Sequence, residues 1–340
     1  MNMFRPKWQK ISTSLVFFTV LGMSSWTVGA AELPGAGKSV QPVFTEDQAA
    51  VFQLEVALEG LRRLGYDVKD TKNVDIPAAH IALSQGDADI YAQNWDPLQN
   101  AFYERAGGSA KLTRVGNLVK GALQGYLIDK ATADKYKIRY LEQLKDPTIA
   151  KLFDGDGDGR ADLIGCPPGW GCEKAIEFQL DAYNLRDTVE HIQGDFTVTH
   201  VDAVTRQKAG QSILYYAYTP LWLGQILVPG KEVVWLEVEE TKLPPEEKSA
   251  VTISPDGKNL GWAVNNIRIV ANNSFLEANA GAKKFFELLT IPLADVNAEN
   301  LLVYNGEKTD EQIRHHVEQW VKDNAAEFDS WIAEAIKAAQ

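Results

Sequence analysis

The sequence predicts an α/β fold with largely parallel sheets. Short apolar or β-branched runs alternate with stretches of helical spacing along most of the 340 residues, and this alternation is typical of α/β proteins. No internal repeat and no low-complexity linker interrupts the pattern. Without the N-terminal segment discussed below, about 310 residues remain, enough for one large or two ordinary α/β domains.

The individual elements follow from residue spacing. A Thr-x-x-Gln capping box at Thr45 begins a helix whose apolar residues recur at helical spacing until Gly65 ends it. A short strand starts at Tyr66, a helix lies near 78–84, and 89–93 (DIYAQ) is the next strand. Further strands are expected at 125–128, 212–216, 233–238 and 267–270, and further helices at 175–183, 280–289, 311–324 and 326–337.

The first thirty residues have the layout of an export signal. Three basic residues precede an apolar stretch, and small residues at 29–31 favour cleavage after Ala30. A membrane anchor is the alternative, but the apolar run is short and is interrupted by Ser, Thr and Gly. We therefore expect residues 1–30 to be removed on export.

The charge excludes some classes of partner. The net charge is −12, and it falls to −15 when the three basic residues of the signal segment are removed. No basic run is present. Nucleic acid and anionic membrane surfaces are therefore poor partners for this chain.

The only two cysteines, Cys166 and Cys172, flank a short loop of sequence GCPPGWGCEK. Export to an oxidising compartment favours a disulfide between them, while two reduced buried thiols are the alternative. Closing a seven-residue loop contributes about 2–2.5 kcal/mol in the loop-entropy model. A chain of this length does not need that contribution, so the bond is expected to fix the shape of the loop that carries Trp170.

Three aromatic residues stand near the ends of predicted strands: Trp95 in NWDP, Trp170 in the cysteine loop, and Tyr218 before Pro220. Each of these rings, taken alone, is readily explained as a partly buried side chain that packs against the core. Together, at the edge where α/β proteins bind ligands, they suggest a cluster of rings for a quaternary ammonium group, which has no N–H donor and is attracted to ring faces. A sugar also stacks on aromatic rings, but it needs many polar partners.

A predicted helix begins near Cys172, directly after Trp170. The backbone N–H groups of Gly171 and Cys172 would then be free at a helix N-terminus, which binds anions. A ring that holds a cation next to amides that hold an anion is a site for a zwitterion. The disulfide would lower the cost of ordering both on binding.

The segment 154–162 (DGDGDGRAD) matches the first nine positions of an EF-hand-type loop. The expected oxygen ligands are the side chains of Asp154, Asp156, Asp158 and Asp162 and the carbonyl of Arg160. Position 12 is Gly165 rather than Glu, so a structural calcium ion and a metal-free acidic turn both remain open.

Catalytic motifs are not found. The sequence contains no G-x-S-x-G, H-E-x-x-H or phosphate-binding glycine loop. An enzyme acting on a quaternary amine has no nucleophile, metal or cofactor motif to support it, and a calcium-dependent surface module is supported only by the acidic loop. We expect no enzymatic activity and no required cofactor.

Along nearly its whole mature length, the chain resembles the periplasmic glycine betaine-binding proteins of osmoprotectant ABC importers. The similarity is carried by AELPG, GYLIDKATADKYKI, LKDPTIAKLFDGDGDGRADLIGC, PGWGCEKAI, VVWLEV and IPLADVNAEN. It implies a two-lobed, type II-like periplasmic binding protein with the ligand in the cleft. It also implies a monomeric receptor for glycine betaine or a related compound (proline betaine, choline or dimethylsulfoniopropionate), delivered to a membrane permease.

The resemblance also assigns site residues. Trp95, Trp170 and Tyr218 match the family's aromatic box, with Gly171 and Cys172 supplying amides to the carboxylate. Tyr218 stands where the best-known relative carries tryptophan, and Gln99 stands where it carries a carboxylate-binding histidine. We expect one lobe at 31–120 plus 262–340 and the other at 121–261, so that Trp95 and the other two rings come from different lobes.

Overall fold

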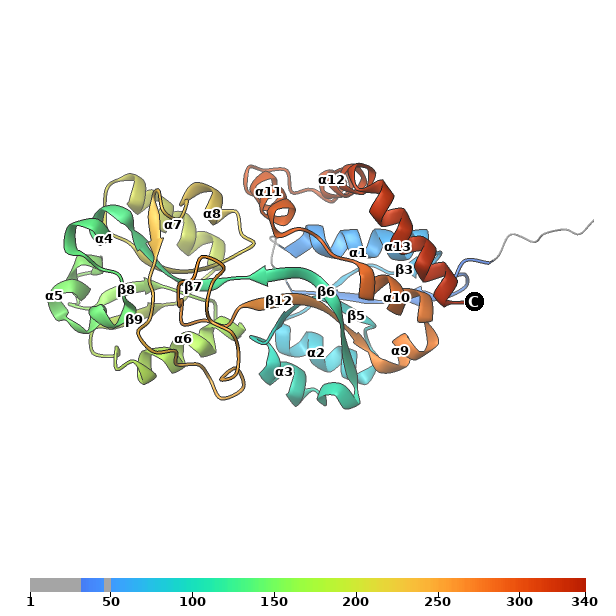
Figure 1. Cartoon of the computed structure of the whole chain (residues 1–340), viewed down its shortest axis with the longest axis horizontal. Coiled ribbons are helices and arrows are strands. Elements are labelled where there is room, and N and C mark those ends of the chain that lie inside the picture. Colours follow the sequence, from blue (N-terminus) through green and yellow to red (C-terminus); the bar gives the residue numbers. More distant parts are fainter. Residues whose placement is uncertain (1–31, 46–49) are drawn as a thin grey trace, which may run out of the picture. The chain divides into compact units, whose positions relative to one another are not determined.

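The fold is built on two five-stranded sheets flanked by helices (Figure 1). The computed structural model describes residues 32–45 and 50–340, and those from Leu33 onward form one compact unit. The predicted signal peptide, residues 1–30, lies outside the described residues, as do positions 46–48 of the predicted capping box. A short parallel pair, β1 (Ser39–Val40) with β3 (Asp67–Val68), adds to the sheets.

The first sheet has the strand order β4-β2-β5-β12-β6. Helices α1, α11, α12 and α13 lie on one side of it, and α2 and α3 lie on the other (Figure 1). Its strands are β2 (Pro42–Phe44), β4 (Lys72–Asn73), β5 (Ile90–Asp96), β6 (Leu112–Ala122) and β12 (Asn265–Asn272). Its helices are α1 (Val51–Arg63), α2 (Ile76–Gln85), α3 (Asn100–Arg105), α9 (Asn273–Ala278), α10 (Ala280–Leu288), α11 (Leu293–Tyr304), α12 (Asp310–Asp323) and α13 (Ala325–Ala338).

The second sheet has the strand order β11-β7-β10-β8-β9. Helices α7 and α8 lie on one side and α6 lies on the other (Figure 1). The strands are β7 (Gln124–Asp129), β8 (Ala161–Ile164), β9 (Val189–Ile192), β10 (Leu214–Tyr218) and β11 (Val233–Trp235). The helices are α4 (Lys130–Tyr136), α5 (Pro147–Ala150), α6 (Gly171–Ala182), α7 (Phe196–Lys208) and α8 (Leu223–Ile226).

Both sheets are mixed rather than largely parallel. Among the described strands, each sheet contains two parallel and two antiparallel pairings. The antiparallel pairings in the first sheet belong to β12, which brings the chain back from the second sheet and pairs with both β5 and β6. β12 therefore runs antiparallel to both of its neighbours, whereas strands joined by βαβ crossovers run parallel to each other.

Each sheet has its own buried core. Leu58, Phe285 and Phe328 belong to the core of the first sheet, and Ile176 and Tyr216 belong to that of the second. The chain leaves the first sheet at the end of β6 and re-enters it at the start of β12. The exact lobe boundaries, 31–120 plus 262–340 and 121–261, stay a prediction.

The predicted helices and strands in the described residues are present, but several elements were not predicted. Strand β6 was missed because Gly116 and Gly121 interrupt its apolar pattern. Gly116 is required there, since its φ is +57° and an added Cβ would lie 2.1 Å from the carbonyl oxygen of Phe286. None of the helices in the described residues is long and apolar enough to cross a membrane.

Candidate functional site

Two of the three predicted rings are in contact. Trp95 lies within β5, one residue before its end, rather than in the turn after it. Tyr218 is the last residue of β10 in the other sheet. The two ring centroids are 5.2 Å apart, and the ring planes meet at 83° in an edge-to-face arrangement, a favourable geometry for an aromatic pair.

Trp170, the third predicted ring, lines the same cavity as Trp95 and Tyr218. It is half-buried and occupies the N-cap position of α6. All three rings line one cavity, and small-molecule sites are typically concave and lined mainly by hydrophobic and aromatic side chains. The described residues around the cavity are Thr45, Ile76, Tyr91, Gln93, Trp95, Leu98, Gln99, Gln124, Trp170, Gly171, Cys172, Tyr216 and Tyr218.

The N-terminus of α6 opens into the same cavity. Gly171 is the first residue of the helix, and no side chain caps this end. The first N–H groups of a helix have no intrahelical acceptor, and they carry the positive end of the helix dipole. Gly171 also packs closely against Leu98, which follows β5: an added Cβ would lie 2.9 Å from Cγ of Leu98 and 3.0 Å from its carbonyl oxygen. Only glycine fits at this contact.

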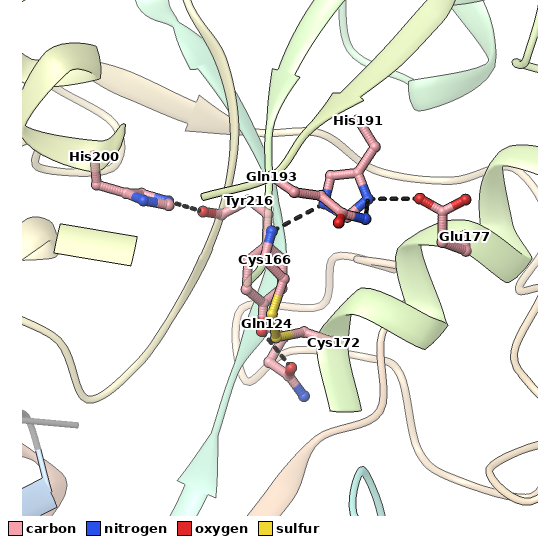
Figure 2. The surroundings of a disulfide bond; sticks show 8 residues. All are labelled: Gln124, Cys166, Cys172, Glu177, His191, Gln193, His200 and Tyr216. Carbon is pink, nitrogen blue, oxygen red and sulfur yellow. Dashed lines mark hydrogen bonds and ion pairs between the residues drawn. A yellow bond between two sulfur atoms is a disulfide. The ribbon is translucent and has the colours of Figure 1, made fainter. Parts of the chain in front are cut away.

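The disulfide predicted between Cys166 and Cys172 is present, with the Cα atoms 5.9 Å apart. Figure 2 shows the side-chain contacts that hold its loop in place. The backbone N–H of Cys166 donates to Nε2 of His191 at 3.0 Å, and Nδ1 of the same ring contacts Glu177 at 2.7 Å. Because Nε2 accepts, the proton lies on Nδ1 and is donated to the carboxylate. Burial lowers the pKa of His191 despite Glu177.

A stack of rings that sequence reasoning missed supports the box. Phe196, the first residue of α7, lies between Trp170 (centroids 5.8 Å apart, planes at 13°) and His200 (3.7 Å, 17°). Phe196 also packs against Tyr218 at 5.3 Å. His200 is fully buried, and burial lowers its pKa to about 4, so the ring is neutral at pH 7. Its Nε2 lies 2.7 Å from the carbonyl oxygen of Tyr216, a contact that ties α7 to β10.

The sequence contains a local signal for the start of α7. Asp195 is the N-cap and accepts from the N–H of Val198 at 2.9 Å, in the manner of a capping residue. The many β-branched residues that follow weaken the helical pattern of this segment. The helix was therefore not predicted, and neither was the ring that Phe196 contributes.

The polar side chains on the Trp95 side of the cavity are largely engaged. Gln93 accepts from the N–H of Thr45 and donates to its carbonyl. Gln99, which the resemblance marks as a carboxylate contact, is 3% exposed and donates through Nε2 to the carbonyl of Gln93 at 3.2 Å. Its Oε1 accepts from Nδ2 of Asn94 at 3.2 Å. Gln99 thus ties the turn that follows β5 to residues within that strand.

The acidic loop is ordered by its own hydrogen bonds. Asp154 accepts from the N–H groups of Gly157 and Gly159, and Asp156 accepts from that of Asp158. Asp158 accepts from the backbone and side chain of Arg160, which also pairs with Glu190. Carboxylate oxygens of Asp154, Asp156 and Asp162 lie within 4.8 Å of one another, whereas Asp158 groups with Asp156 and Glu190. The predicted ligands thus divide between two neighbouring groups.

Residues 38–323 match the family described as the substrate binding domain of ABC-type glycine betaine transport systems. The glycine betaine-binding periplasmic protein OusX of Dickeya dadantii is 45% identical over 327 residues, covering 96% of this chain and 98% of the relative. The glycine betaine/proline betaine-binding periplasmic protein of Escherichia coli is 45% identical over 326 residues, with the same coverage.

Solved structures with the same fold include lactococcal OpuAC, closed and complexed with glycine betaine (TM-score 0.65, 21% identity, 87% of this chain and 99% of that one). Another is an ABC-transporter choline-binding protein in complex with choline (TM-score 0.68, 16% identity, 88% and 96%). These likenesses confirm the two-lobed binding-protein fold. With the match over residues 38–323 and relatives of 45% identity, the chain belongs to the family of substrate-binding domains of ABC-type glycine betaine transport systems.

Proposed function

We propose that this protein is an exported receptor that binds glycine betaine, or a close zwitterionic relative, and delivers it to the membrane permease of an ABC importer. One observation carries the proposal: a single cavity joins three aromatic rings to the uncapped N-terminus of α6. The relatives of 45% identity bear names that state glycine betaine binding, which supports the same ligand class.

The cationic half of the ligand would lie against Trp95, Trp170 and Tyr218. A trimethylammonium group offers methyl surface and a diffuse positive charge, and ring faces offer apolar area and a negative quadrupole. Each such contact is worth about 0.5–2 kcal/mol once desolvated. Because Tyr218 has a smaller ring than indole, part of the selectivity among betaines is expected to reside there.

The carboxylate would lie at the N–H groups of Gly171 and Cys172. These donors are backbone groups. Their position is fixed because the disulfide and the hydrogen bond from Cys166 to His191 hold the loop that precedes them. Preorganised donors lower the ordering cost of binding. Gln99 lines the same cavity and stays a candidate for a further contact.

The charge of the cavity favours a zwitterion. Among the described lining residues, none is Asp, Glu, Lys, Arg or His. A ligand with no net charge therefore leaves no uncompensated charge in a buried site. Choline, with a net positive charge and no carboxylate, would leave the α6 amides unused. A sugar would find Gln93 and Gln99 already paired.

The arrangement supports capture rather than catalysis. Trp95 comes from the first sheet, and Trp170 and Tyr218 come from the side of the second, so we propose that the lobes close on the ligand between them. One chain supplies every group named, which supports a monomer. Residues 1–30 would direct export, with cleavage near Ala30, to the periplasm where the named relatives reside. Calcium is not supported by the comparisons and is not part of this proposal.

Isothermal titration of the mature protein tests the proposal. Glycine betaine, proline betaine, choline and proline are titrated into the wild type and into Trp170→Ala. We expect one-to-one binding of glycine betaine that Trp170→Ala abolishes, and ligand recovered unchanged afterwards. Binding of choline but not of glycine betaine, or no binding of any of the four, would overturn the proposed ligand.

A further inference from the structure

A buried amide on the second sheet is not accounted for by the residues described above. Gln124 is the first residue of β7, is 1% exposed, and lines the cavity. Its Oε1 accepts from the hydroxyl of Tyr216 at 2.6 Å (Figure 2). Its Nε2 is buried and has no hydrogen-bond partner among the described residues.

Such a donor is costly unless something accepts from it. An unpaired buried N–H group has lost its hydrogen bond to water and gained none in return, and an unsatisfied group in a native structure calls for an explanation. Because the amide oxygen of Gln124 accepts from the hydroxyl of Tyr216, the NH₂ group points away from that hydroxyl. A ligand acceptor in the cavity would satisfy it.

The backbone of Gln124 is held rigidly at the edge where the other site residues meet. Gln124 pairs with Tyr218 across the β7–β10 ladder. Beyond that pair, the N–H of Thr219 donates to the carbonyl of Leu123 at 2.9 Å, and the N–H of Leu123 donates to Oγ1 of Thr219 at 3.1 Å. The backbone of Gln124 is therefore fixed beside that of Tyr218, and the hydroxyl of Tyr216 orients its side-chain amide.

We propose that Gln124 supplies the side-chain donor to the carboxylate of the ligand, together with the amides of Gly171 and Cys172. The inference rests on the proposed function, because it requires a ligand that carries a carboxylate. Gln99 is the competing candidate. Its amide already bonds Gln93 and Asn94, whereas the NH₂ of Gln124 needs no bond broken before it can donate.

The test compares Gln124→Met with two matched controls. Met has nearly the shape of Gln without its amide. Gln99→Met removes the competing amide, and Tyr216→Phe removes only the bond that orients Gln124. Removing a hydrogen bond to a charged group is expected to raise the Kd for glycine betaine about 10- to 100-fold in Gln124→Met. We expect a smaller rise in Gln99→Met and an intermediate one in Tyr216→Phe.

A second readout separates direct contact from loss of packing. The side-chain NH₂ resonances of Gln124, assigned by their absence from Gln124→Met, should move downfield when glycine betaine binds. If these resonances stay in place while the wild type binds glycine betaine, or if Gln99→Met loses affinity and Gln124→Met does not, the inference is wrong and the proposed function stands. If the wild type does not bind glycine betaine, the proposed function itself fails.

Discussion

Substitution of Trp222 by alanine should weaken glycine betaine binding, although Trp222 does not line the box cavity. Trp222 is 6% exposed and stacks on Tyr304 of α11, with the centroids 4.0 Å apart and the planes at 10°. The N–H of the preceding Leu221 donates to Oδ1 of Asn297 on the same helix at 2.9 Å. Since α11 packs on the first sheet and Trp222 follows β10 of the second, this pair joins the two lobes beside the site.

The size of the effect follows from the contact. If the lobes must part to admit the ligand, the stack exists only in the closed state, and its loss lowers the population competent to hold ligand. An aromatic pair contributes about 0.5–1.5 kcal/mol beyond its burial. A loss near 1 kcal/mol corresponds to a rise in Kd of about 5-fold.

The assay is a double-mutant cycle by isothermal titration with glycine betaine. The set comprises the wild type, Trp222→Ala, Tyr304→Ala and the double variant, with the melting temperature of each recorded to verify folding. Tyr304→Phe keeps the stacked ring and should bind like the wild type. The double variant should be no weaker than the weaker single variant. A folded Trp222→Ala with unchanged Kd, or two single effects that simply add, would show that the Trp222–Tyr304 stack does not stabilise the closed state.

Three further predictions concern the site and its loop. Trp95→Ala should raise the Kd for glycine betaine at least about 10-fold, since it removes one wall of the box; an unchanged Kd in titration would contradict the box assignment. Burial lowers the pKa of His191 below its usual 6.5, so its stabilising effect is present above pH 6.5 and is lost as the pH falls and the ring protonates. Melting temperature and betaine affinity should fall between pH 7 and pH 5, less steeply in His191→Gln, and equal slopes would contradict a role for this ring. Reduction of the Cys166–Cys172 disulfide should lower the free energy of unfolding by only about 2 kcal/mol, because the loop that it closes is small. It should nevertheless raise the Kd for glycine betaine several-fold. Equal Kd values with and without reductant would show that the disulfide does not preorganise the site.

Local signals were sufficient for some of the site. The stapled loop, the helix start after it and the placing of Trp170 beside free amides could be inferred from ten consecutive residues, because disulfides, prolines and helix termini act locally. Trp95 and Tyr218 were also found, since both follow strand-like runs. The structure brings these residues to one cavity, which no local pattern could have guaranteed.

Other parts depended on distant pairings. The position of Gln124 in the site depends on Tyr216, 92 residues away in sequence, and neither residue is unusual in its own segment. Phe196 was missed with its helix because β-branched residues weaken the periodicity there. The mixed pairing follows from β12 in the first sheet and from β7 in the second, and the direction of these strands relative to their neighbours cannot be read from their composition.

A crystal structure of the mature protein with glycine betaine would locate both ends of the ligand in the cavity. We expect the trimethylammonium group between Trp95, Trp170 and Tyr218, and the carboxylate within hydrogen-bond distance of the N–H groups of Gly171 and Cys172. A ligand bound with its carboxylate away from the N-terminus of α6, or bound outside this cavity, would contradict this expectation.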